Sequence, residues 1–240
     1  MVDPVDFVIP LGTGSRCHND ELRLLLRSLQ ANAMRCRNVI VVATSPPDWL
    51  RNVKIIPLDD PLAHNKDGNI IRKVLTAAAL PEISSEFVWS CDDCVFLKPC
   101  DLANLPPIHN PRTKDRFPAN GSIWQRRVRR TFEFFEQRGV TLDCNFESHV
   151  PQRFPARKLL RAMRDVDYSS DIGYSINTLF YGLLGITRGF DQSLFKDTNE
   201  NIGDAKTGKV LCQYNDEAFT TGLREKLFRI FPKPSKYEKE

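Results

Sequence analysis

The sequence contains 240 residues, 41% of them hydrophobic and 27% charged, and its formal net charge at pH 7 is +4. These values are typical of a globular protein and exclude the disordered, collagen-like and membrane-embedded classes. The length suits one compact domain, so we expect residues 1–240 to fold as a single unit. The mild positive charge permits an anionic partner without requiring one.

The sequence predicts neither a membrane span nor a secretory signal. No stretch is long and apolar enough to cross a bilayer, and the N-terminal segment carries Asp3 where a signal peptide has basic residues. We therefore expect a protein without a membrane span that stays in the cytoplasm.

In the first half of the chain, short apolar strands alternate with two amphipathic helices. The predicted strands are residues 6–12, 38–43, 53–58 and 86–90. One helix begins at Asn19, its expected N-cap, and the other follows the loop 60–69. Their apolar stripes are Leu22, Leu25, Leu26 and Leu29, and Ile71, Val74, Leu75 and Ala78. This alternation predicts an α/β fold with a mostly parallel sheet between covering helices.

In a parallel sheet, ligands bind beyond the carboxyl ends of the strands. The loops that follow the four predicted strands start at Gly12, Ser45, Asp59 and Cys91. We expect these loops to lie close together at one edge of the sheet.

The second half of the chain is less regular. Residues 106–121 form a long irregular segment, while residues 122–139, 155–165 and 217–229 are predicted helices. Residues 173–186 are apolar throughout and fit either a helix or a strand. No internal repeat or low-complexity linker divides the chain.

The cysteines are expected to be reduced and free of zinc. Cys91 and Cys94 have the spacing of a zinc knuckle, with Cys100 nearby, but no second Cys or Cys-His pair follows at a matching distance. The total of seven cysteines is odd, and a chain of this size needs no disulfide staples. Elemental analysis of the purified protein should therefore find no stoichiometric zinc.

Two adjacent aspartates, Asp92 and Asp93, stand between two apolar runs in "EFVWSCDDCVFL". Like charges repel, and the burial of either one is costly unless a cation or hydrogen-bond donors compensate. Mn²⁺ or Mg²⁺ would relieve this repulsion, because both prefer hard oxygen ligands and share their shell with substrate phosphates. The alternative is a solvated acidic turn without a ligand.

Two further loops fit an anionic ligand. "LGTGSR" contains Gly12 and Gly14, which permit close approach of a ligand to the backbone, but it matches neither the dinucleotide nor the Walker fingerprint. "HNKDGN" places Lys66 and Asn69 at the start of a helix, where backbone amides attract anions. A structural turn and an ordinary helix entry are the respective alternatives.

The order of these segments resembles that of nucleotide-sugar-dependent glycosyltransferases of the GT-A fold. The matching segments are "DFVIPLGTGSRCHNDELRLLLRSL", "VIVVATSPPDWL", "KDGNIIRKVLTA" and "EFVWSCDDCVFL". More specifically, the chain is similar to stealth-type capsule phosphotransferases and to small glycosyltransferase-like proteins of bacteria and their phages. The later segments "HVPQRF" and "NDEAFTTGLREKLFRIFPKPSKYE" also resemble that group.

The resemblance implies a GT-A fold with a Rossmann-like, mostly parallel sheet and a more irregular helical C-terminal half. Residues 1–105 would bind the nucleotide sugar, and residues 106–240 would face the acceptor. The residues implied in nucleotide-sugar binding are Gly12, Thr13, Gly14, Arg16, Lys66, Asp67, Asn69 and Asp92. The implied location is the cytoplasm of a bacterium or of a phage-infected host cell.

The resemblance also implies a metal site and a catalytic group. Asp93 and Asp92 would hold Mn²⁺ or Mg²⁺, with His149 as a late metal or phosphate ligand. Asp216 would be the base on the acceptor side, although a helix cap is the alternative role for this residue. Cys91 departs from the family, which often has an acidic residue or Asn there, and this puts the contact to the donor ribose in doubt.

Two basic segments suggest a polyanionic acceptor. "WQRRVRR" and "RKLLRAMR" concentrate cationic side chains that fit a phosphate backbone, although a solvated basic helix face is the alternative. These side chains are Arg126, Arg127, Arg129 and Arg130, and Arg157, Lys158, Arg161 and Arg164.

The sequence therefore predicts a metal-dependent glycosyltransferase that moves a sugar from a nucleotide-diphosphate sugar to an acceptor hydroxyl. The acceptor is either a glycan or DNA, such as a hydroxymethylated base of phage DNA. Transfer of a sugar phosphate to a polysaccharide is one alternative. A non-catalytic nucleic-acid-binding protein on a degenerate transferase scaffold is the other.

Overall fold

A computed structural model describes residues 3–201 and 205–239 and contains a five-stranded central sheet. Its strand order is β4-β3-β1-β5-β9. The first four strands are parallel, and β9 runs antiparallel to β5 at the edge. The strands are β1 (Val5–Leu11), β3 (Cys36–Ala43), β4 (Lys54–Pro57), β5 (Glu86–Trp89) and β9 (Gln152–Pro155). The predicted mostly parallel α/β sheet is thus confirmed.

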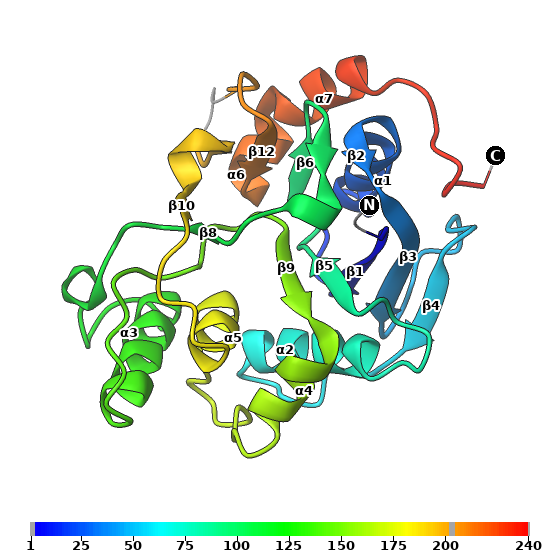
Figure 1. Ribbon diagram of the computed structural model, residues 1–240. Helices are drawn as coiled ribbons and strands as arrows, with labels where there is room; N and C mark the ends of the chain where they lie inside the picture. The colour runs from blue at the N-terminus through cyan, green and yellow to red at the C-terminus, as the bar shows by residue number, and fades with distance from the viewer. Residues whose placement is uncertain (1–2, 202–204, 240) are drawn as a thin grey trace.

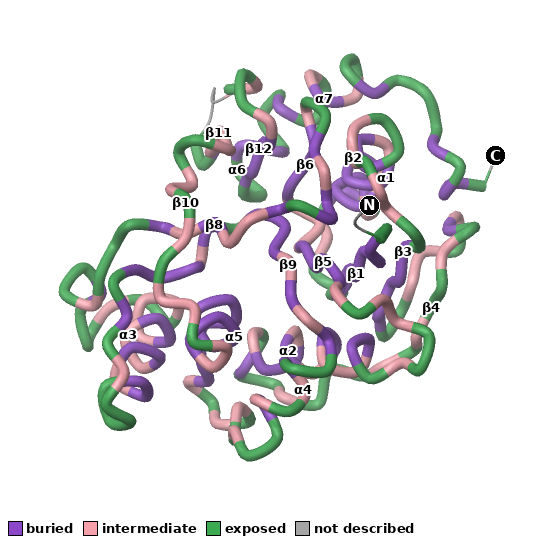
Figure 2. The backbone as a smooth tube through the Cα atoms, in the orientation of Figure 1, coloured by how far each residue is buried: buried purple, intermediate pink, exposed green. Residues whose placement is uncertain are grey.

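Helices cover both faces of this sheet (Figure 1). The helix α1 (Asp20–Asn32) packs its four predicted leucines against one face, where they meet alternate residues of β1 and β3. The other face is covered by α2 (Lys66–Ala78), α4 (Ala156–Met163) and α5 (Ile176–Leu183), with α3 (Ile123–Glu136) beyond them. The central strands are buried along most of their length, as Figure 2 shows, because both of their faces are covered.

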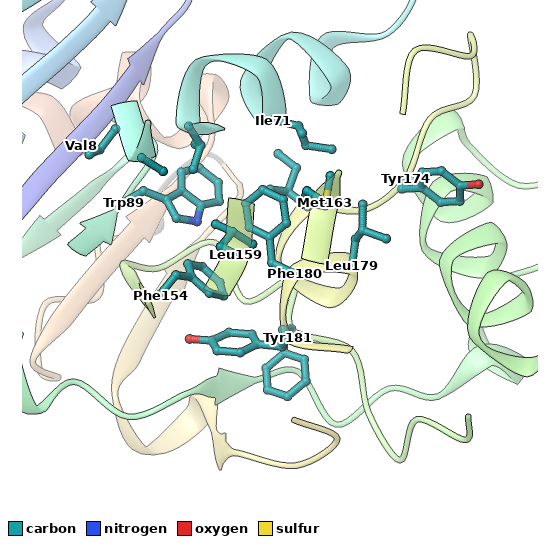
Figure 3. Packing of buried hydrophobic residues seen from close by; sticks show 14 of the residues in the cluster. Val8, Ile71, Trp89, Phe154, Leu159, Met163, Tyr174, Leu179, Phe180 and Tyr181 are labelled. Carbon is teal, nitrogen blue, oxygen red and sulfur yellow. The ribbon is translucent and has the colours of Figure 1, made fainter. Parts of the chain in front are cut away.

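The hydrophobic core on the sheet face covered by α2, α4 and α5 joins the two halves of the chain. Trp89 of β5 and Phe154 of β9 contribute aromatic rings, and Phe180 and Tyr181 of α5 pack beside them (Figure 3). The rings of Phe154 and Tyr181 have centroids 4.4 Å apart. Because β9 adds to the sheet edge beside β5, the second half of the chain shares one hydrophobic core with the first.

Smaller sheets accompany the central sheet. A three-stranded sheet has the order β11-β12-β6, in which β12 runs antiparallel to β6. Its strands are β6 (Cys94–Phe96), β11 (Lys196–Asn199) and β12 (Leu211–Tyr214). Two-stranded pairs join β2 (Ala33–Met34) to β7 (Cys100–Asp101), and β8 (Ile108–His109) to β10 (Phe190–Asp191). The sequence did not predict these short strands, because their pairing is long-range.

Three sequence-based expectations for the helices are resolved. The apolar segment 173–186 contains the helix α5 and not a strand. The predicted final helix is broken into α6 (Asp216–Ala218), a π-type turn (Phe219–Leu223) and α7 (Arg224–Ile230), with Gly222 at φ +124°. Asn19 is the N-cap residue of α1, as predicted, with Asp20 and Glu21 in the first turn, but its side chain makes no capping hydrogen bond. Instead, the Ser15 hydroxyl accepts from the Asn19 amide at 2.9 Å.

The C-terminal segment crosses the outside of α1 and reaches the loop after β3. Leu50 forms a β-bridge with Glu238, and the Arg51 amide donates to the Tyr237 carbonyl at 2.9 Å. The Glu238 carboxylate is 1% exposed and accepts from Arg27 at 2.8 Å and from Arg23 at 3.1 Å. Burial alone would raise the pKa of Glu238, but the hydrogen bonds from Arg27 and Ser235 lower it to about 2.

The buried Glu238 pair should stabilise the fold in a pH-dependent way. Because the folded-state pKa lies below the ordinary value of 4.5, the contribution is complete above pH 4.5 and is lost as the pH falls toward 2. We expect Glu238→Gln to lower the free energy of unfolding at pH 7 by about 2–4 kcal/mol, because it removes the carboxylate that pairs with the largely buried Arg27. Urea unfolding of both proteins between pH 7 and pH 2 measures this difference.

The matched control is Glu225→Gln, which removes an exposed ion pair with Arg229. Exposed pairs within a helix contribute about 0.3–0.5 kcal/mol, so this variant should unfold almost as the wild type does. Two results would contradict the stabilising role of the Glu238 carboxylate. One is an equal decrease in the free energy of unfolding in both variants, and the other is an effect of Glu238→Gln that does not become smaller below pH 4.5.

Candidate active site

The end of β5 brings Asp92 and Asp93 to the carboxyl edge of the sheet. After Trp89, the Ser90 amide still donates to the Val8 carbonyl of β1 at 3.1 Å, and the chain then leaves the sheet. The buried Tyr214 fixes the backbone of the aspartates from β12. Its amide donates to the Asp93 carbonyl at 3.1 Å, and its hydroxyl donates to the Asp92 carbonyl at 3.4 Å.

The pairing of β6 with β12 brings Asp216 to the same place. Asp93 immediately precedes β6, and Asp216 is the second residue after β12; Cys94 and Gln213 are register partners in these strands. A cavity of about 650 Å³ opens between these ends. It is lined by Arg16, Asp93, Asn215, Asp216, Glu217 and Thr220. Asn215 caps α6 by accepting from the Ala218 amide, so the capping role belongs to Asn215 and leaves the Asp216 side chain exposed to the cavity.

The start of α2 and the segment before β9 lie at the same edge of the sheet. Because β9 is antiparallel to β5 and Trp89 pairs with Gln152, the residues that precede β9 lie beyond the end of β5. This places Glu147 and His149 at the edge that carries the aspartates. Lys66, the first residue of α2, is exposed there and lies within electrostatic range of both aspartates.

The two aspartates are half-buried, and their carboxyl groups resist ionisation. Burial raises the pKa of Asp92 to about 7, with a further increase from the charge of Asp93. Burial also raises the pKa of Asp93 to about 6, although the nearby Lys66 and Lys196 oppose the increase. One buried oxygen of Asp93, Oδ1, has no hydrogen-bond partner within the described residues. Such an oxygen is available to a cation or a ligand.

Glu147 and Lys196 belong to this cluster, and the sequence did not identify either as a site residue. Burial raises the pKa of Glu147 to about 7, and its carboxylate accepts from the amide and hydroxyl of Thr178 at 2.9 and 3.0 Å. Lys196 donates to the carbonyl of Ser148, and burial lowers its pKa. A prediction of β11 would have been needed to find Lys196, since only the strand pairing brings it to the site.

His149 faces Lys66, Asp67 and Lys196, and its backbone has a left-handed φ of +49°. The side chain is exposed to solvent, but the protein atoms around it, followed by the charge of Lys196, lower its pKa to about 4. The imidazole is therefore neutral at pH 7, and one ring nitrogen keeps its lone pair. Such a nitrogen can accept a hydrogen bond or bind a metal.

The glycine loop borders the cavity through Arg16, whose guanidinium lies 3.8 Å from the Asp216 carboxylate. Gly12, Thr13 and Gly14 are exposed. A Cβ atom at either glycine would meet nothing within 4 Å, and neither residue has a positive φ. The fold itself therefore does not require glycine at these two positions. The open space beside the backbone can admit a ligand.

Asn69 was predicted to bind the ligand, but its side chain is engaged in hydrogen bonds within the protein. Its side-chain oxygen accepts from the Leu62 amide at 3.1 Å, and its side-chain nitrogen donates to the Leu62 carbonyl at 3.0 Å. Both ends of the amide thus hold the loop before α2. Lys73, one turn further, is buried and joins the Leu11 carbonyl to the Asp60 carboxylate, at 2.8 Å each, across the ends of β1 and β4.

The interpretation of "WQRRVRR" as a phosphate-binding face is wrong for Arg127, which is buried. Its guanidinium pairs with Asp67 and donates to the carbonyls of His64 and Ile172. Two neighbours on α3 also have intramolecular partners: Arg129 pairs with Glu133, and Arg130 donates to Ser170. The run of arginines therefore mostly joins parts of this chain.

The cationic side chains of "RKLLRAMR" are exposed, but their segment starts at the edge of the sheet opposite to the aspartates. Arg157, Lys158 and Arg161 lie on α4, which follows β9, and Arg164 is the residue directly after this helix. Pro155 at the end of β9 pairs with Glu86 at the start of β5, whereas the aspartates follow the other end of β5. A ligand on these four side chains would therefore enter the site only by crossing the sheet.

The cysteines contribute no ligand cluster in the part of the chain that is described. All seven are free thiols, and Cys94 and Cys100 are buried. No group of three or more His, Cys, Asp or Glu side chains among residues 3–201 and 205–239 has the geometry to hold a metal. No helix within these residues is long and apolar enough to cross a membrane.

No protein-family model matches the sequence, and no curated protein matches it either. Solved structures do match. One of them is the galactosyltransferase LgtC in complex with donor and acceptor sugar analogues, with a TM-score of 0.55 and 12% sequence identity. The similarity covers 96% of each chain. The architecture of this chain is therefore the GT-A, Rossmann-like fold, as the sequence predicted.

The glycine loop allows a test that separates ligand binding from folding. We expect Gly12→Ala and Gly14→Ala to leave the free energy of unfolding unchanged within about 0.5 kcal/mol, because their Cβ atoms meet nothing. If a nucleotide occupies the loop, both variants should bind it more weakly. Urea unfolding and calorimetric titration of nucleotide sugars measure the two effects.

Gly173→Ala is the matched control. Gly173 has a φ of +66°, and a Cβ there would lie 2.5 Å from the Asn65 side chain. This variant should lose about 1–3 kcal/mol of stability. A large stability loss in the Gly12 or Gly14 variant, or unchanged ligand affinity in both, would argue against a nucleotide in this loop.

Proposed function

We propose that the protein is a metal-dependent glycosyltransferase that takes a nucleotide-diphosphate sugar at the carboxyl edge of its GT-A sheet. The observation that carries the proposal is the half-buried pair Asp92 and Asp93, in which one Asp93 oxygen has no hydrogen-bond partner among the described residues and the charges of two lysines act on the carboxylate. Ligands of parallel α/β sheets bind at this edge. The similarity in fold to a galactosyltransferase supports the same reaction class.

A divalent cation fits this pair when the donor completes its coordination. Mg²⁺ and similar cations commonly bind through one or two carboxylates together with substrate phosphates and water. Asp93 supplies a buried oxygen without a hydrogen-bond partner among the described residues, and Asp92 stands beside it. Asp93 and Asp92 would hold Mn²⁺ or Mg²⁺ together with the donor phosphates and water, and His149 would contact a phosphate. When bound, the cation would supply positive charge to the diphosphate leaving group.

The chain's own residues would orient the donor and receive the acceptor. Arg16 and the loop from Gly12 to Gly14 would contact the nucleotide, and Lys66 would bind the diphosphate. The sugar would lie between the aspartates and Glu147. Asp216, exposed in the cavity beside Arg16, would take the proton from the acceptor hydroxyl as the new glycosidic bond forms.

A neutral, hydroxyl-rich acceptor fits the cavity better than DNA does. The lining carries three carboxylates against one guanidinium, Arg16, so a polyanion would be repelled. Its polar side chains offer hydrogen-bond partners to sugar hydroxyls. Arg127 is buried and unavailable to phosphate, and the exposed cations of α4 begin at the other edge of the sheet. We therefore favour a glycan acceptor over a modified DNA base and over a purely nucleic-acid-binding role.

Asp93→Asn tests the donor site. The variant keeps the shape of the side chain and removes its charge, so Mn²⁺-dependent binding of the donor should fall at least about 100-fold, while the melting temperature stays within a few degrees. A panel of UDP-, GDP-, ADP- and dTDP-sugars is titrated calorimetrically with and without Mn²⁺. Asp165→Asn, at an exposed residue after α4, is the control and should bind as the wild type does. Unchanged Mn²⁺-dependent affinity in a folded Asp93→Asn protein would exclude the metal assignment.

The acceptor is tested by the mass of the product. With a donor that binds, the protein should transfer a sugar to glycan acceptors and not to duplex DNA, with or without hydroxymethylated bases. The added mass also separates transfer of a sugar from transfer of a sugar phosphate. Glycosylated DNA, or duplex binding that weakens steeply with salt, would instead support the nucleic-acid alternatives.

A further inference from the structure

Arg127 joins three segments of the chain at the start of α2. Its Nε donates to the Ile172 carbonyl at 2.6 Å, and its terminal nitrogens reach the His64 carbonyl at 3.2 Å and the Asp67 carboxylate at 3.1 Å. The side chain is 7% exposed. A buried guanidinium with these partners is held in one orientation, because each bond restricts the planar group.

Asn65 anchors the same turn from the other side. Its side-chain oxygen caps α2 by accepting from the Gly68 amide at 2.8 Å, and its nitrogen donates to the Tyr168 and Ser170 carbonyls at 2.8 and 2.7 Å. The first turn of α2 is therefore fixed on both sides of Lys66. Lys66 itself is exposed and forms no ion pair within the described residues.

Lys66 and Asp67 are neighbours in the sequence, and the charge of Lys66 acts on the Asp67 carboxylate. Opposite charges attract each other more strongly where protein displaces water. The Asp67 carboxylate is instead paired with Arg127, at 3.1 Å. Arg127 thereby competes with Lys66 for Asp67.

We propose that Arg127 is a positioning residue that keeps Asp67 away from Lys66, so that the Lys66 ammonium remains available to the diphosphate of the donor. This inference deepens the proposed function and rests on it for the identity of the ligand. It reassigns Arg127 from a contact with nucleic acid to a contact within the donor site. Without Arg127, the unpaired Asp67 would turn to Lys66 and reduce its attraction for an anion.

The first test measures the affinity for UDP, GDP and ADP by calorimetry, with Mn²⁺ present. Arg127→Met should raise the Kd of the nucleotide that binds best about 10-fold. Arg127→Lys, which keeps the charge beside Asp67, should stay within about 3-fold of the wild type. The double variant Arg127→Met with Asp67→Asn should also return to within about 3-fold, because the competitor for Lys66 is removed. A purely structural role predicts no such rescue.

The second test needs no nucleotide. Lysine side chains are labelled with limiting acetic anhydride, and the rate at each lysine is read by mass spectrometry. Lys66 should react several-fold more slowly in Arg127→Met than in the wild type, and its rate should recover in the double variant. Lys158, exposed on α4, is the internal control, and Arg129→Met is the matched variant on α3, because Arg129 pairs with Glu133 and donates to the Phe117 carbonyl.

The outcomes separate this inference from the proposed function. Unchanged labelling of Lys66 in folded Arg127→Met protein overturns the role of Arg127. A double variant whose nucleotide Kd and Lys66 labelling rate equal those of the single variant also overturns it. If Arg127→Met does not fold, Arg127→Lys and the double variant are compared with the wild type, and slowed labelling of Lys66 in both overturns it. Labelling that changes as expected, with no nucleotide bound by the wild type, supports the role of Arg127 and contradicts the donor site.

Discussion

Two like charges held side by side at the end of β5 determine how the rest of the site is arranged. Asp92 and Asp93 are half-buried, and burial raises their pKa values to about 7 and about 6, with a further increase for Asp92 from the charge of Asp93. Tyr214 from β12 fixes their backbone, so the carboxylates cannot move apart freely. Lys66 and Lys196 provide positive charge from two other elements. A divalent cation bound together with a donor diphosphate would complete the neutralisation.

The parts of the fold that sequence reasoning predicted are those fixed by local pattern. The apolar runs of β1 and β3, and the leucine stripe of α1, are visible in short windows of sequence and are buried as expected. The strands β9, β11 and β12 are only four residues each and lack a clear alternation of apolar and polar side chains. Their place depends on pairing with distant strands, which a local pattern does not contain.

The candidate site follows the same division. Arg16, Asp93 and Asp216 were predicted from sequence, and they line one cavity. Lys196 was missed because β11 was missed. Arg127 was misinterpreted for a related reason: a run of arginines on a helix resembles a solvated basic face until its tertiary partners are known. Burial, and the pairing with Asp67, give this arginine a role inside the protein.

The central claim is that the carboxyl edge of this sheet binds and activates a nucleotide-diphosphate sugar with the help of a divalent cation. The most direct measurement is the release of nucleoside diphosphate from a panel of nucleotide sugars, with Mn²⁺ or with EDTA, with and without glycan acceptors. The account predicts release from at least one donor, acceleration by an acceptor, and loss of release in EDTA. Release of no nucleoside diphosphate from any donor by folded, Mn²⁺-supplied protein would contradict it.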